Sequence, residues 1–90
     1  MRKERAVITV NGADHPGIVA AITKILADMG INIEDLSQTV VQDLFTMIVI
    51  VDLRGADMIE LQDKLNKAGA KQGVQITVQH EDIFKYMHRV

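Results

Sequence analysis

The sequence predicts an α+β fold in which an antiparallel sheet carries two helices on one of its faces. Three observations support this prediction. Two stretches place apolar residues at helical spacing. Other stretches are rich in β-branched residues or alternate between apolar and polar side chains, as strands do. Glycine, proline and asparagine separate these stretches, which gives the order β-α-β-β-α-β.

The first strand and the first helix flank a cluster of turn residues. Residues 6–10 are mostly β-branched, and Asn11-Gly12 is expected to end this strand. From Pro16 onward, apolar residues recur at helical spacing as far as Met29, and Gly30 is expected to cap the helix. Alanines widen the apolar surface of this helix beyond one stripe, so part of its back is expected to meet a partner.

The middle of the chain predicts a hairpin. Residues 31–41 form a strand pattern whose inward-facing parity switches, which indicates a bulge near Glu34-Asp35. Residues 44–51 are apolar on both parities, as is typical of a central strand covered on both faces. The polar pair Gln42-Asp43 lies between them and supplies the turn.

A second amphipathic helix and a last strand follow. Gly69 is expected to end the helix, and residues 74–79 alternate as a strand with one wet face. Residues 82–90 are expected to form a short C-terminal helix. The apolar face of the second helix consists of Met58, Leu61, Leu65 and Ala68.

The complete order is that of a ferredoxin-like sandwich, a four-stranded antiparallel sheet with both helices on one face. The opposite face of the sheet is then expected to be open and partly aliphatic, which makes it a second candidate interface. Its expected residues are Val7, Thr9, Thr46, Ile48, Ile50 and Thr77.

Composition limits the classes of function. A chain of 90 residues with 48% hydrophobic residues is expected to form a single domain over residues 1–90. A net charge of −2 argues against direct nucleic-acid binding. The chain has no cysteine and no segment of transmembrane length, so we expect a cytoplasmic protein that does not bind membranes.

No pattern in the sequence predicts an active site. The carboxylates of Glu34-Asp35 and Glu81-Asp82 are adjacent in sequence and point apart in a strand, so neither pair suits general acid/base work. His15, His80 and His88 form no metal motif, and no cofactor is expected. We therefore expect no catalysis. A weaker alternative makes His15 a general base in its loop.

Residues 11–19 are the most informative stretch of the chain. Gly12 can adopt backbone angles that are closed to other residues, and Pro16 has a φ suited to a first helical turn. Gly17 lets another molecule approach closely. Free N–H groups at the start of the helix favour an anion such as an amino-acid carboxylate. A tight turn needs the same residues, so a purely structural role is the alternative.

The segment Asp14-His15-Pro16-Gly17-Ile18-Val19, followed by an apolar helix that runs into Met29-Gly30-Ile31-Asn32-Ile33, resembles the ACT domain. This family is a small regulatory module of amino-acid metabolism. The resemblance covers nearly the whole chain. Within the family, the sequence looks most like short stand-alone ACT proteins and is similar to the halves of the glycine cleavage system repressor.

The resemblance implies that a ligand lies at a dimer interface, between this loop and the start of the second strand of the other subunit. Asp14 would accept from an α-ammonium group, and Asn32 could both donate and accept. Some amino-acid-binding members carry Asn where this chain has Asp14, which leaves the orientation of the ligand open. The ligand-binding residues implied are Asp14, His15, Gly17, Ile18, Asn32 and Ile33.

Both carried-over polar residues also have simple structural explanations. Asp14 could serve only as a helix cap, and Asn32 could be an ordinary outward-facing residue of an edge strand. The sequence thus favours a homodimeric regulatory module that binds an amino acid or a similar small metabolite and acts through a partner protein. The alternative is an interaction module that dimerises without binding a ligand.

Overall fold

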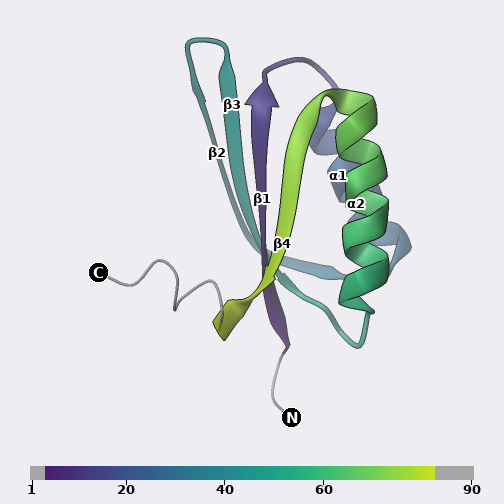
Figure 1. Cartoon of the computed structure of the whole chain (residues 1–90). Helices are drawn as coiled ribbons and strands as arrows, with labels where there is room; N and C mark the ends of the chain where they lie inside the picture. Colours follow the sequence, from purple (N-terminus) through teal and green to yellow (C-terminus); the bar gives the residue numbers. More distant parts are fainter. Residues whose placement is uncertain (1–3, 83–90) are drawn as a thin grey trace.

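The structure is a computed structural model that describes residues 4–82. Its strands form one antiparallel sheet in the order β2-β3-β1-β4, with both helices on the same face (Figure 1). The ferredoxin-like order is therefore confirmed. Apart from residue 82, the expected C-terminal helix lies outside the described residues. The elements are β1 (Arg5–Ala13), α1 (Ile18–Asp28), β2 (Asn32–Val41), β3 (Leu44–Asp52), α2 (Met58–Gln72) and β4 (Val74–His80).

The core lies between the sheet and the two helices. Alternate residues of β1 and β3 point toward the helices and are fully buried, as the period of two in a strand requires. The helices contribute one apolar stripe each, with Ile18, Ile22 and Leu26 from α1 and Leu61 and Leu65 from α2. No helix in the described part of the chain is long and apolar enough to cross a membrane.

The end of β1 differs from the sequence prediction. Asn11-Gly12 does not stop the strand, which continues to Ala13 because Gly12 pairs with Phe45 on one side and Val74 on the other. Gly12 does not have a positive φ. A Cβ atom at this position would lie 2.7 Å from Val74 Cγ1 and 2.9 Å from Val74 Cα. Close packing between neighbouring strands, rather than an unusual backbone angle, requires glycine here.

Helix α1 begins two residues later than predicted but ends as predicted. Pro16 and Gly17 form a turn, and Gly17 has a φ of 99°. At the other end, the Gly30 N–H donates to Ala27 O (3.1 Å) and the Ile31 N–H donates to Leu26 O (2.9 Å). With its φ of 71°, Gly30 is the left-handed residue of a Schellman motif.

Helix α2 does not end at Gly69. It continues to Gln72, and Gly73 ends it with a φ of 70°. Gly69 is buried inside the helix instead, where a Cβ atom would lie 2.7 Å from Val74 O. The residue allows α2 to lie close against the start of β4, a packing requirement between two elements that the helical period alone does not reveal.

The predicted bulge is confirmed, because the pairing of β2 with β3 shifts between Ile33 and Asp35. The prediction that β3 is covered on both faces is wrong. Leu44 is 65% exposed and Ile48 is 38% exposed, since both helices lie on the other face. The open face is also less aliphatic than expected. Val7, which lies between Ile50 and Gln79 in the pairing of the strands, is only 4% exposed.

Candidate functional site

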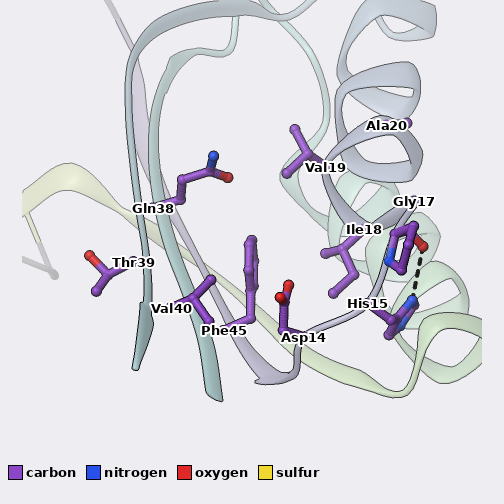
Figure 2. Close-up of a pocket in the computed structure, with 11 residues that line it drawn as sticks. Asp14, His15, Gly17, Ile18, Val19, Ala20, Gln38, Thr39, Val40 and Phe45 are labelled. Atoms are coloured by element: carbon purple, nitrogen blue, oxygen red, sulfur yellow. Dashed lines mark hydrogen bonds between the residues drawn. The ribbon is translucent and has the colours of Figure 1, made fainter. Parts of the chain in front are cut away.

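A cleft of about 400 Å³ lies where the loop after β1 faces the far end of β2 (Figure 2). One wall is the loop and the first turn of α1, and the other wall is formed by the end of β2 and the Phe45 ring of β3. Ligand pockets in proteins are typically about 300–1,000 Å³, so the cleft has room for a small metabolite. It is lined by residues 14–20 and by Gln38, Thr39, Val40 and Phe45.

Asp14 presents an unpartnered carboxylate to this cleft. Its backbone N–H donates to Asp43 O (2.9 Å), which ties the loop to the β2–β3 hairpin. Its side chain makes no hydrogen bond or ion pair with the residues that the structure describes, and points between Phe45 and Ile18 in Figure 2. The N-cap of α1 is Gly17, and no side chain caps this helix. Asp14 therefore does not act as a helix cap.

The first turn of α1, which directly follows this loop, supplies hydrogen-bond donors to the same cleft. The Ala21 N–H donates to Gly17 O (3.0 Å) and is the first amide used within the helix. The N–H groups of residues 18–20 precede it and have no partner inside the helix. The Ile18 side chain is 1% exposed and belongs to the core, so what Ile18 can offer a ligand is its backbone N–H. These amides and the helix dipole favour a negatively charged group.

His15 fastens the loop to the second helix. Its Nδ1 lies 3.0 Å from Pro16 O, and its Nε2 makes a hydrogen bond with Gln72 O at the C-terminal end of α2. Only the protonated ring can donate from both nitrogens. The contact with Gln72 O and, to a lesser extent, that with Pro16 O raise the pKa of His15 above its ordinary value. Both ring nitrogens are engaged with backbone carbonyl oxygens, an arrangement that suits holding the loop rather than taking a proton from a ligand.

This arrangement predicts a pH dependence. Because the pKa of His15 is higher in the folded chain, its contribution to stability is complete below the ordinary pKa of about 6.5 and is lost as pH rises through the folded value. We expect the melting temperature to fall over this range, and His15→Gln to flatten that part of the profile. His80→Gln, at the far end of β4, is the control and should keep the dependence. If His15→Gln and the wild type show the same dependence of melting temperature on pH, His15 does not stabilise the fold in this way.

Asn32 and Ile33 do not join the cleft within one chain. Asn32 pairs with Asp52, which in turn pairs with Arg5 at the start of β1, whereas Asp14 follows the end of β1. The two predicted polar residues therefore lie at opposite ends of the sheet. Only a second chain can bring an Asn32 to this Asp14.

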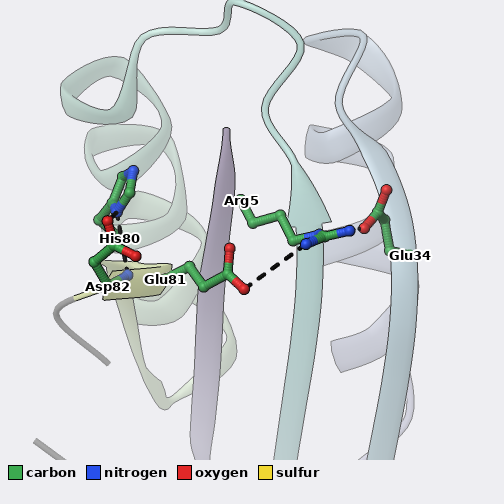
Figure 3. A network of polar contacts seen from close by, with 5 residues as sticks. All are labelled: Arg5, Glu34, His80, Glu81 and Asp82. Atoms are coloured by element: carbon green, nitrogen blue, oxygen red, sulfur yellow. Dashed lines mark hydrogen bonds and ion pairs between the residues drawn. The ribbon is translucent and has the colours of Figure 1, made fainter. Parts of the chain in front are cut away.

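The end of the sheet near Asn32 is held by charged groups on β1 and β2 and by one that directly follows β4 (Figure 3). The Arg5 Nε donates to Glu34 Oε1 (2.7 Å), and Arg5 Nη1 lies 3.8 Å from Glu81 Oε1. Glu34 is the residue left over at the bulge, so the bulge brings a carboxylate to Arg5. This contact raises the pKa of Arg5. The network stabilises the start of β2 against β1.

Sequence reasoning missed the part of the cleft that β2 and β3 provide. Gln38 lies on the same parity as Leu36 and Val40, the parity that faces the helices after the bulge. A polar residue on that parity is the signal that could have identified it. Phe45 gave no such signal, because a buried aromatic residue in a strand is ordinary. Among the described residues, no group of three or more His, Cys, Asp or Glu could hold a metal ion.

Comparison with known families decides what kind of domain this is. The family profile described as ACT domain matches residues 4–79. This chain belongs to the ACT domain family. ACT domains are regulatory modules, and they typically bind small molecules. A UPF0237 protein of Methanopyrus kandleri is 56% identical over 88 residues, which cover 96% of this chain and 98% of that protein.

Solved structures agree with this ACT assignment. An ACT domain protein from Streptococcus pneumoniae has a TM-score of 0.81 and 36% identity, and the match covers 93% of this chain and 97% of that one. A putative glycine cleavage system transcriptional repressor has a TM-score of 0.79 at 20% identity. That match covers 89% of this chain but 47% of the repressor, so the fold of this ACT domain corresponds to about half of that protein.

Proposed function

We propose that this ACT domain binds an amino acid or a similar small zwitterionic metabolite in the Asp14 cleft, at an interface between two copies of the chain. The observation that carries the proposal is the pairing of chemistries in the cleft. The loop contributes the unpartnered carboxylate of Asp14, and the free N–H groups of the first turn of α1 follow it along the same wall of the cleft. An α-ammonium group matches the first, and an α-carboxylate matches the second.

Strand β2 is where the second copy is expected to bind. Strand β2 forms one edge of the sheet. At an edge, the N–H and C=O groups of alternate residues point out of the sheet and have no neighbouring strand to pair with. Most of its side chains are exposed, including the apolar Ile33 (37%), Val40 (49%) and Val41 (62%). Strand addition at this edge would pair the free backbone groups and cover these apolar side chains.

Antiparallel addition of β2 to β2 also completes the binding site. A twofold axis through the middle of the joined strands brings the start of one β2 beside the end of the other. The cleft lies against the end of β2, at residues 38–40. Asn32 and Ile33 of the second copy thereby reach the cleft that Asp14 lines, as the resemblance to ACT domains implies.

A ligand that contacts both chains stabilises the paired state, because it binds that state more tightly than the separate chains. Its presence changes the surface that the pair offers to other molecules. Since the ACT domain is a regulatory module, we propose that a partner protein reads this change. His15 contributes by holding the loop against α2 rather than by reacting with the ligand.

A thermal-shift screen against the twenty amino acids and related metabolites tests this function. A ligand present at 100 times its Kd stabilises the folded state by about 2.7 kcal/mol. We expect a selective rise in melting temperature, which Asp14→Ala strongly reduces and Asp63→Ala retains. Asp63 is the control because it is an exposed carboxylate on α2, away from the cleft. No shift at millimolar concentrations, with a dimer seen by light scattering, would favour the alternative of an interaction module without a ligand.

A further inference from the structure

The two edge strands of the sheet, β2 and β4, differ in how far their outward-facing backbone groups are covered. Helix α2 runs alongside β4 at one edge (Figure 1). Most side chains of β2, at the other edge, are exposed. On the β4 edge, the Gln62 Nε2 donates to Ile76 O (3.2 Å), and the Val78 N–H donates to Gln62 Oε1 (2.9 Å). One side-chain amide thus makes the two hydrogen bonds that a neighbouring strand would make at these positions.

The surroundings of Gln62 hold its amide in this position. Its Nε2 also donates to Asn66 Oδ1 (2.7 Å), one turn further along α2. At the other end of α2, Gly69 lets the helix lie directly against Val74 O. Val74, Ile76 and Val78 share one parity of β4, and their backbone groups face away from β1. Helix α2 and the Gln62 amide together cover these outward-facing backbone groups of β4.

Next to Gln62 the edge is otherwise accessible. A hollow of about 460 Å³ lies there between α2 and β4, lined by Met58, Ile59, Gln62, Asp63, Asn66 and Val78. Within the hollow, the Gln62 amide is the side-chain group that reaches the β4 backbone in the described part of the chain. Removing that amide would leave an acceptor and a donor facing an open approach.

Strand β2 has no comparable cover. Among residues 4–82, the side-chain hydrogen bond to its backbone runs from the Leu36 N–H to Asp35 Oδ1 (2.9 Å), a residue of the same strand. No side chain of α1 forms a bridge across two residues of β2 in the way that Gln62 does across β4. The difference leaves β2 as the edge that is open to strand addition.

We propose that Gln62 limits assembly by closing the β4 edge, so that copies of this chain join through β2 alone and stop at a pair. The inference rests on the β2 pairing in the proposed function. A pair joined through β2 carries one β4 edge at each end. If these edges were open, β4 could add to β4 of the next pair, and the addition would repeat without closing. Closed assembly keeps the number of ligand sites per particle fixed.

The test replaces Gln62 and measures mass against concentration by light scattering. Gln62→Ala removes both edge hydrogen bonds while favouring the helix, so the chain should still fold. We expect its mean mass to rise to at least about twice the wild-type mass at high concentration. Gln62→Lys also removes the acceptor for Val78 but places a charge at the edge, which opposes strand addition, so it should keep the wild-type mass. Lys64→Ala is the control on the exposed face of α2.

Two results overturn the inference. One is a folded Gln62→Ala protein whose mass equals that of the wild type at every concentration. The other is equal growth of Gln62→Ala and Gln62→Lys, which would point to lost packing rather than to an opened edge. Failure of the proposed function is seen separately. It shows as a monomeric wild type or as no amino-acid binding, whereas β4 pairing of Gln62→Ala chains does not need a pre-formed β2 pair.

Discussion

Asp14→Ala is expected to weaken binding of the amino acid selected by the screen about 10- to 100-fold, because a hydrogen bond to a charged group contributes about 1.5–3 kcal/mol. The fold should be little affected. The Asp14 carboxylate makes no hydrogen bond or ion pair among the described residues and does not cap α1. Isothermal titration calorimetry measures the affinity, and a melting curve without ligand measures the stability.

Asp14→Asn provides a graded comparison. The amide keeps an acceptor for the ammonium group but loses the charge, so its affinity should lie between those of the wild type and Asp14→Ala. Asp63→Ala changes the net charge by the same amount at an exposed site and should bind as the wild type does. Undiminished binding in Asp14→Ala contradicts the assignment of the cleft. A loss of unfolding free energy in the ligand-free variant as large as the loss of binding free energy would instead indicate a structural role.

Gly12→Ala is expected to lower the free energy of unfolding by about 1–3 kcal/mol, the usual cost of forcing an extra carbon into a packed site. The added Cβ would lie 2.9 Å from Val74 Cα, a backbone atom that cannot move without shifting β4. Urea denaturation measures the effect. Asn11→Ala changes the neighbouring exposed residue and loses its hydrogen bond from Thr46 Oγ1 (3.2 Å). Its effect should stay within about 0.5 kcal/mol.

Equal midpoints for Gly12→Ala and the wild type would contradict the packing explanation. They would show that β1 and β4 can separate at little cost. The loop that carries Asp14 begins directly after β1, so such freedom would also weaken the case for a preformed cleft.

The sequence predicted correctly those features that depend on residues close together in the chain. The Gly30 cap follows from a helical period that ends in glycine, and the bulge in β2 follows from a switch of parity within one strand. The predictions for Gly12 and Gly69 were wrong because Gly12 is required by the pairing of β1 with β4, and Gly69 by the turn that folds α2 back against Val74. Glycine is required at these two positions by the packing of the folded chain and not by the adjacent residues in the sequence.

The candidate site was predictable in part for the same reason. Asp14 and Gly17 were found because the loop has its own sequence pattern and family resemblance. Gln38 and Phe45 reach the cleft only through the register of the β2–β3 hairpin, which the sequence alone did not supply. The hydrogen bond of His15 with Gln72 O depends on where α2 ends, which is at Gln72 and not at Gly69.

The most direct test of a site shared between two chains mixes two defective variants. Chains with Asp14→Ala and chains with Asn32→Ala are unfolded together, refolded and titrated with the amino acid selected by the screen. If each site takes Asp14 from one chain and Asn32 from the other, a mixed pair keeps one intact site, and about one quarter of the wild-type binding sites should return. A mixture that recovers no site of wild-type affinity, and binds only as weakly as each variant alone, would contradict a site shared between two chains.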